Sequence, residues 1–116
     1  MKNSLDKEAI LARLGGSQQL FENICASFMK LLPGQLAVIG DAVSNRDAET
    51  LSRAVHRLKG SVAYFDSGSV STTISELEAL TKRPEFDETR ARFLFERMAG
   101  QMQELIEDLQ ALRAPN

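Results

Sequence analysis

The chain has 116 residues, of which 43% are hydrophobic and 26% charged, the size and balance of a single globular domain over residues 1–116. Its net charge of −2 and its lack of tryptophan argue against nucleic-acid binding as the main task. No apolar run approaches the roughly 20 residues of a membrane span, and the single cysteine cannot form an internal disulfide. We therefore expect a cytoplasmic domain without direct membrane contact, either free-standing or part of a larger protein.

The N-terminal third predicts two helices. Residues 5–14 form a short first helix with Asp6 as its N-cap, and Ser17 caps a second helix that continues to about residue 45. Pro33 and Gly34 predict a kink or a break in this second helix. The residues expected on its apolar side are Leu20, Phe21, Ile24, Phe28, Leu31, Leu36, Ile39 and Val43.

Residues 47–65 form the clearest amphipathic helix, with Asp47 as its cap. Its apolar stripe consists of Leu51, Val55, Leu58, Val62 and Phe65. The only histidine, His56, lies about 140° around the helix from the centre of that stripe, so it is expected to face water. Lys59 and Gly60, three and four residues later, flank the imidazole on the same exposed face.

This exposed group suits one particular chemistry. Glycine inside a helix costs about 1 kcal/mol relative to alanine, but it leaves room for a bulky partner. An imidazole with a nucleophilic nitrogen, steric access and a neighbouring ammonium could carry a phosphoryl group. On helix geometry alone, a solvated histidine and lysine beside a tolerated glycine is the simpler interpretation.

The C-terminal half predicts two further helices. Residues 69–82 keep helical spacing of their apolar side chains despite many serine and β-branched residues, and Pro84 marks the stop. Residues 87–113 form the longest helix, with an apolar stripe of Ala91, Leu94, Met98, Met102, Leu105, Leu109 and Leu112. The fold predicted is all-α: an antiparallel up-and-down four-helix bundle with a short additional N-terminal helix.

The run from His56 to Ser61, H-R-L-K-G-S, resembles the signature of the histidine-containing phosphotransfer (HPt) domains of bacterial two-component phosphorelays. The segments L-A-R-L-G-G at 11–16 and F-M-K-L-L-P-G-Q-L at 28–36 are similar to other parts of the family pattern, and Leu77-Glu78 falls where the family has a later L-E. One departure is Asp66, where the family usually has glycine, which affects the turn after the histidine helix.

The resemblance implies specific roles. His56 would be the phosphoacceptor through Nε2, Lys59 would stabilise the phosphoryl charge, and Gly60 would give clearance. Arg53 and Arg57 would add positive field toward a partner, although Arg57 is equally compatible with an ordinary solvated charge.

Two further residues near the histidine each have two interpretations. Tyr64 would belong either to the rim of a docking surface or to the cover of the bundle end. Glu78 matches the family position, but we interpret it as a surface residue packing beside the histidine helix.

The chain lacks the motifs needed to take phosphate from ATP. It has no phosphate-binding loop, and one histidine with one distant cysteine makes no metal site. The resemblance therefore implies a monomeric phosphocarrier rather than an enzyme, with no cofactor of its own and with Mg²⁺ on the partner. The implied partners are response-regulator receiver domains, together with a hybrid sensor histidine kinase if the domain belongs to such a system.

Three alternatives remain open at this stage. A histidine-kinase dimerisation and phosphoacceptor domain usually has an acidic residue directly after the histidine, where this chain has Arg57, and it requires a dimer. A helical adaptor without chemistry would not need His56. A phosphatase acting on receivers would need an amide or carboxylate aimed into the partner, and nothing marks Gln101 or Gln103 for that role.

Overall fold

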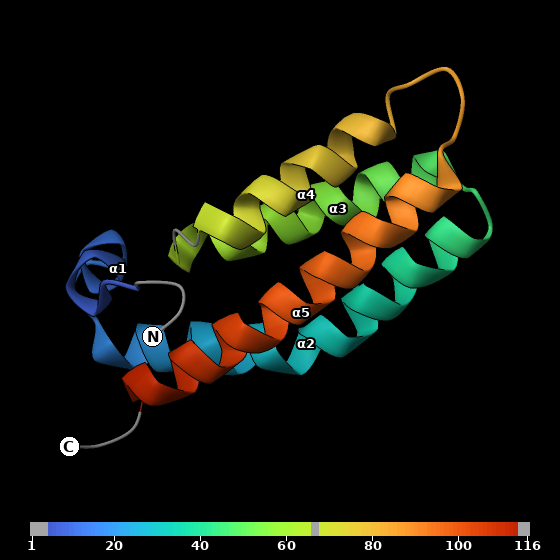
Figure 1. The fold of residues 1–116 in the computed structure, drawn as a ribbon. Helices are drawn as coiled ribbons and strands as arrows, with labels where there is room; N and C mark the ends of the chain where they lie inside the picture. The colour runs from blue at the N-terminus through green and yellow to red at the C-terminus, as the bar shows by residue number, and fades with distance from the viewer. Residues whose placement is uncertain (1–4, 66–67, 114–116) are drawn as a thin grey trace.

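The computed structural model describes residues 5–65 and 68–113, and these residues fold into helices joined by short turns (Figure 1). In chain order the elements are α1 Lys7–Arg13, α2 Gln18–Ser44, α3 Ala48–Val62, the 3₁₀ turn η1 Ala63–Phe65, α4 Gly68–Leu80 and α5 Glu88–Arg113. No helix among the described residues is long and apolar enough to span a membrane.

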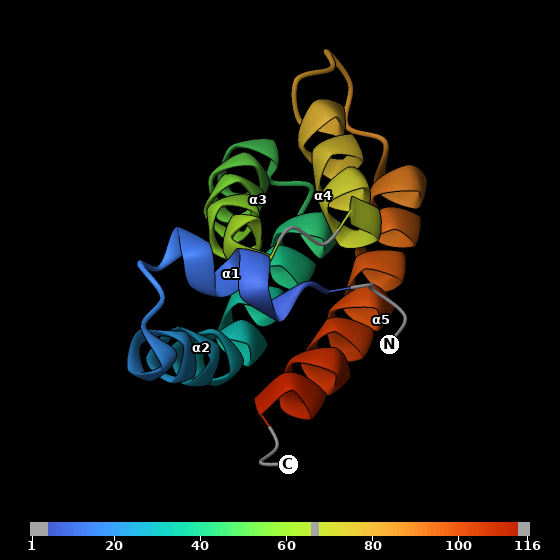
Figure 2. The same cartoon turned by 90° about the vertical axis from the view of Figure 1, so that its left-hand side faces the viewer.

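Four of the helices form a closed bundle. α2 packs against α3, α3 against α4, α4 against α5, and α5 against α2, and consecutive helices run in opposite directions (Figure 1). With 27 and 26 residues, α2 and α5 are much longer than α3 and α4, which have 15 and 13. α1 packs against α2 and η1 near the end of α3 (Figure 2). The predicted helical bundle with an additional N-terminal helix is confirmed.

The helix starts follow from local capping, as the sequence predicts. The side chains of Asp6, Ser17 and Asp47 each accept a hydrogen bond from the backbone N–H three residues later, at 3.2, 3.0 and 3.1 Å. Each bond satisfies one of the N–H groups that a helix N-terminus leaves without an intrahelical partner. Three of the expected helix beginnings are therefore correct to within one or two residues.

The apolar stripe of α3 forms the middle of the core. The stripe consists of Leu51, Val55, Leu58 and Val62 of α3 and is continued by Phe65 of η1, and all five are at most 1% exposed. The stripe of α5 is also buried, except that Leu112 is only partly so. Because α3 is fixed between α2 and α4 by this stripe, the residues on its opposite face must point to solvent.

Two corrections concern α2. Of the kink or break expected at Pro33, the break is wrong, because the helix continues through that residue. Pro33 is exposed, so the carbonyl that loses its intrahelical bond can be hydrated, and packing of α2 against both α3 and α5 sustains the helix. Leu20 and Leu31 are expected on the buried side but are exposed. The buried side of α2 is centred on Phe21 and Phe28, and both leucines lie at its edge. The turn that contains Asp66 lies outside the described residues.

Replacing Leu58 by alanine tests this core. The side chain is fully buried, so Leu58→Ala should lower the free energy of unfolding by about 2–5 kcal/mol in chemical denaturation. Leu31→Ala, the same truncation at a side chain that is 57% exposed, should change it by less than about 0.5 kcal/mol. Similar losses from both variants would contradict the placement of α3.

Candidate functional site

His56 lies in the middle of α3 and its side chain is 80% exposed. This exposure is the one predicted from the helical stripe. The imidazole is held by the helix backbone rather than by a loop, which fixes the direction in which it projects. A large partner can therefore reach the ring without any rearrangement of the core.

Glu78 of α4 contacts the imidazole directly. Its Oε2 lies 3.3 Å from His56 Nδ1, and its Oε1 accepts a hydrogen bond of 3.3 Å from Lys59 Nζ. One carboxylate thus bridges two residues of the neighbouring helix. Glu78 does pack beside the histidine helix, as interpreted from the sequence. In addition, it contacts both His56 and Lys59.

The bridge keeps the Glu78 carboxylate ionised. The side chain is only 16% exposed, and this burial raises its pKa. The hydrogen bonds from His56 and Lys59, together with the charges of Lys59 and Lys82, outweigh the burial, so that the pKa lies below the ordinary value for glutamate. At neutral pH the group is a pure hydrogen-bond acceptor.

A signal for this contact exists in the sequence. Because α3 and α4 form an antiparallel hairpin, residues equally far from the turn lie at the same height along the bundle. The position midway between 56 and 78 falls between the end of η1 at Phe65 and the start of α4 at Gly68, so the hairpin places the histidine and the glutamate side by side. Helical periodicity within one segment does not contain this information.

Lys59 and Gly60 flank the imidazole on α3 as expected. The lysine side chain is about half exposed and its ammonium is held on the α4 side by Glu78. A Cβ atom added at Gly60 would meet no atom within 4 Å outside its own helix neighbourhood. No packing in the described structure therefore requires glycine at position 60, and its small size leaves open space beside the histidine.

The two arginines near the histidine have different surroundings. Arg53 pairs with Glu49 of the same helix at 3.2 Å and is well exposed. Arg57 instead borders a hollow between α2 and α3. Tyr64, in η1, lies at the other end of the same inter-helix surface, and its backbone carbonyl accepts a hydrogen bond from Arg13.

Apolar side chains line this surface, which we call the α2–α3 groove. Leu31, Val38 and Tyr64 are 57%, 48% and 46% exposed. The lining residues of its two adjoining hollows are Ile24, Ser27, Phe28, Leu31, Gly34, Gln35, Val38, Ala54, Arg57, Ser61 and Tyr64. Exposed apolar side chains gathered along one inter-helix groove, rather than scattered singly, are typical of an interaction surface.

Other candidate groups lie apart from this site. Ser61 donates its hydroxyl hydrogen bond to the Arg57 carbonyl, so His56 does not activate it. Gln101 and Gln103 belong to α5, which lies diagonally across the bundle from α3. Among the described residues, no group of three or more histidine, cysteine, aspartate or glutamate side chains could hold a metal ion.

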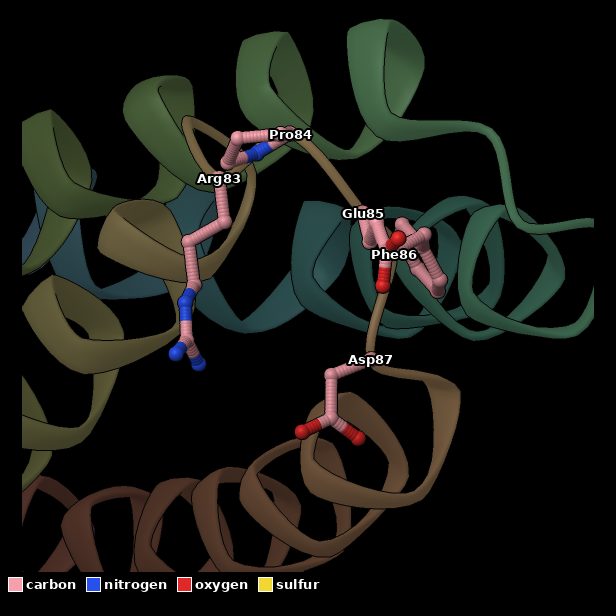
Figure 3. A pocket seen from close by; sticks show the side chains of 5 residues that line it. All are labelled: Arg83, Pro84, Glu85, Phe86 and Asp87. Atoms are coloured by element: carbon pink, nitrogen blue, oxygen red, sulfur yellow. The ribbon is translucent and has the colours of Figure 1, made fainter.

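A further hollow follows the loop between α4 and α5, at the end of the bundle. Figure 3 shows its lining residues, with Arg83 and Asp87 extending from the two ends of the loop and Phe86 between them. It contains neither a histidine nor a cysteine and has no contact with His56. The chemistry of the chain is thus concentrated on α3 and α4.

The sequence pattern of the Hpt domain family matches residues 23–114. The chain belongs to the Hpt domain family. The match spans most of α2 and all of α3, α4 and α5, and so includes His56 and Glu78, whereas α1 precedes it. Comparison with curated proteins and with solved structures gave no match.

Membership defines the general role of this Hpt domain. Hpt domains are phosphocarrier modules of phosphorelays, and they interact with receiver domains and kinases. The family match does not by itself assign a role to any one residue. The role of each residue depends on the geometry around His56.

Gly60 offers a direct test of whether the helix needs glycine there. Because an added Cβ meets open space, Gly60→Ala should raise the free energy of unfolding by about 0.5–1 kcal/mol in urea denaturation. Gly100→Ala in α5, where an added Cβ also meets open space, should give a similar gain. Destabilisation at position 60 alone would show that Gly60 has a structural role.

Proposed function

We propose that this Hpt domain accepts a phosphoryl group on His56 from the phosphoaspartate of one receiver domain and passes it to the aspartate of another. The observation that supports this most strongly is the exposure of His56. The only histidine of the chain projects from the middle of a helix. Beside it are the ammonium group of Lys59 and the open space at Gly60. A phosphocarrier needs an imidazole that two different partners can reach in turn.

The proposed reaction is a reversible displacement at phosphorus. The lone pair of His56 Nε2 attacks the phosphorus atom, the P–N bond forms, and the acyl P–O bond breaks with release of the receiver carboxylate. In the second transfer an aspartate carboxylate attacks the same phosphorus atom, and the electrons of the P–N bond return to Nε2. Neither step consumes ATP on this chain.

The receiver would supply the metal-dependent part of the chemistry. We propose that Mg²⁺ binds to the acidic site of the receiver and neutralises phosphoryl oxygens there. This Hpt domain would need no cofactor of its own. Its contribution is the nucleophile, a local cation and a surface that holds the receiver in register.

Lys59 is proposed to stabilise the charge on the transferred group. An ammonium near a phosphoryl oxygen forms a charge-assisted hydrogen bond, which is stronger than a neutral one. Glu78 keeps the ammonium beside the imidazole, because its two oxygens contact Lys59 Nζ and His56 Nδ1. Gly60 would leave the space that the receiver loops occupy during transfer.

The α2–α3 groove is proposed as the docking surface for the receiver. The groove adjoins the histidine helix, is lined by Leu31, Val38 and Tyr64, and carries Arg57 at its edge. The α4 side of His56 is instead occupied by the polar bridge to Glu78. An apolar patch on the receiver would thus bury itself against α2 and α3 and bring its aspartate over His56. Arg53, paired with Glu49, would act at the rim of this contact.

We also propose where and in what form the domain acts. Phosphotransfer between receivers requires the cytoplasmic compartment in which receivers operate. A monomer suffices, because the site consists of residues from α3 and α4 of one chain. The domain would work either free-standing or as the cytoplasmic part of a larger sensor protein.

Substituting His56 tests the proposal directly. Receiver domains of the same genome, each phosphorylated with a small-molecule phosphodonor and Mg²⁺, should transfer label to the wild-type chain within minutes in at least one case. The label should be labile in acid and stable in alkali, as a phosphoramidate is, and His56→Gln should abolish it. Acid-stable label, or label retained by His56→Gln, would exclude His56 as the acceptor. Normal partner binding and signalling by that variant would favour the adaptor interpretation.

The docking surface has its own matched pair of variants. Leu31→Ala should weaken binding of the cognate receiver about tenfold in calorimetry, because a half-exposed leucine that becomes buried contributes about 1–2 kcal/mol. Phe93→Ala on α5, a truncation at a residue that is 51% exposed but outside the groove, should leave the affinity unchanged. Equal losses, or a loss only with Phe93→Ala, would place the receiver elsewhere.

A further inference from the structure

We infer that Gly34 determines which receivers the domain accepts: because it carries no side chain, it leaves a hollow in the α2–α3 groove that admits one apolar side chain of the receiver. A carboxylate beside that side chain on the receiver pairs with Arg57, which borders the same hollow. This inference rests on the proposed docking of a receiver in the groove. It adds the chemistry that the receiver must present there.

The hollow, which we call the Gly34 hollow, has the size of one side chain. Its volume is about 250 Å³, and its lining residues are Leu31, Gly34, Gln35, Val38, Ala54 and Arg57. A protein cavity of roughly 150 Å³ holds a benzene ring, whereas small-molecule sites usually measure about 300–1,000 Å³. The Gly34 hollow is therefore large enough for a leucine or phenylalanine side chain and smaller than a typical small-molecule site.

The open space lies over Gly34 itself. Leu31, Gly34 and Val38 follow one another along the same face of α2 at helical spacing. Leu31 and Val38 are both about half exposed, so apolar side chains lie on either side of the glycine. A Cβ atom added at Gly34 would meet no atom within 4 Å outside its own helix neighbourhood. A larger side chain at position 34 would therefore extend into the hollow.

The fold itself does not require glycine at position 34. Glycine destabilises a helix interior, and among the described residues only Gly15 and Gly16 are glycines with a positive φ. Gly40, also in α2, is different, because a Cβ atom added there would lie 3.0 Å from the ring of Phe95 in α5. Packing against α5 thus explains Gly40, whereas Gly34 only keeps part of the groove empty.

The α3 side of the hollow combines a small apolar residue with a charge. Ala54 is partly buried against the core, and Arg57 is exposed. Within the described part of the chain, the Arg57 side chain has no hydrogen bond or ion pair, whereas Arg53 pairs with Glu49 at 3.2 Å. None of the described residues that line the hollow is acidic. A guanidinium in this position favours a carboxylate supplied by the partner.

These features define the occupant of the hollow. Arg57 directly follows His56 in α3, so a receiver that reaches the imidazole also covers the Gly34 hollow. Removal of an apolar side chain from water supplies affinity, and the neighbouring charge pair supplies orientation. A receiver that lacks this pair of side chains, or that presents a group too large for the hollow, binds less tightly. The hollow therefore discriminates between receivers that would all react with His56 in the same way.

Filling the hollow tests the inference without weakening the fold. Gly34→Leu should raise the urea midpoint of unfolding, because leucine favours a helix and the added atoms meet open space. The same variant should bind the receiver domain that labels the wild type fastest about tenfold less tightly in calorimetry. Gly100→Leu, the same change at an open position of α5, should also raise the midpoint but leave the affinity unchanged. Equal affinities of the wild type and Gly34→Leu would overturn the inference.

A matching change in the receiver identifies the occupant. The exposed apolar residues of that receiver are replaced singly by alanine, and each variant is titrated against the wild-type chain and against Gly34→Leu. One truncation should weaken binding to the wild type about tenfold and have little further effect on Gly34→Leu, because both changes remove the same contact. Additive losses at every receiver position would refute an apolar occupant.

Charge reversal tests the part played by Arg57. Arg57→Glu should weaken binding about tenfold at low salt and less at high salt, because ions screen the lost attraction. Replacement of one acidic residue of the receiver by arginine should restore the affinity for Arg57→Glu. Arg97→Glu, which changes the net charge equally on α5 outside the groove, should leave the affinity unchanged. Equal losses from the two reversals would contradict a specific pair with Arg57.

The proposed function and this inference fail in different ways. If no receiver labels the wild-type chain, the proposed function fails. If a receiver labels His56 and binds Gly34→Leu as tightly as the wild type, the proposed function stands and only the task of the hollow is refuted. A wild type that dimerises in sedimentation, with Gly34→Leu monomeric, would assign the hollow to a second copy of the chain and would also overturn the inference.

Discussion

The burial of the α3 stripe is the constraint on which the site depends. Five apolar residues at helical spacing, from Leu51 to Phe65, fix the rotation of α3 inside the bundle. His56 must then project to solvent, because it lies on the opposite face of the same helix. The core therefore sets the direction of the reactive side chain, and a change in core packing that rotated α3 would move the imidazole without altering any residue of the site.

The two neighbours of α3 give the histidine two different surroundings. On the α4 side, the largely buried carboxylate of Glu78 contacts both His56 and Lys59. On the α2 side, Leu31 and Val38 leave an apolar groove exposed. The α4 side of His56 is therefore polar and charged, and the α2 side is apolar. Lys59 and Gly60 lie between these two regions, where a transferred phosphoryl group would be.

Local patterns predict much of this arrangement, and tertiary contacts decide the rest. The capping residues and the α3 stripe are properties of single segments, so the helices and the exposure of His56 follow from the sequence. The break that was one of the two alternatives at Pro33 does not occur, because propensity ignores the support that α2 receives from two packed neighbours. Leu31 was expected in the core because helical periodicity does not distinguish a buried position from a half-exposed position at the edge of the apolar face. The contact of Glu78 with His56 joins two helices, and only the position of the connection between α3 and α4 could indicate it.

The most direct test of the account is to locate the phosphoryl group on the wild-type chain. Combined ³¹P and ¹⁵N NMR of the domain phosphorylated by a receiver should show one phosphoramidate, bonded to Nε2 of His56, with the proton still on Nδ1. A phosphoryl group on another residue would contradict the assignment of His56. A phosphoryl group on Nδ1 would contradict the orientation of the ring that the bridge from α4 imposes.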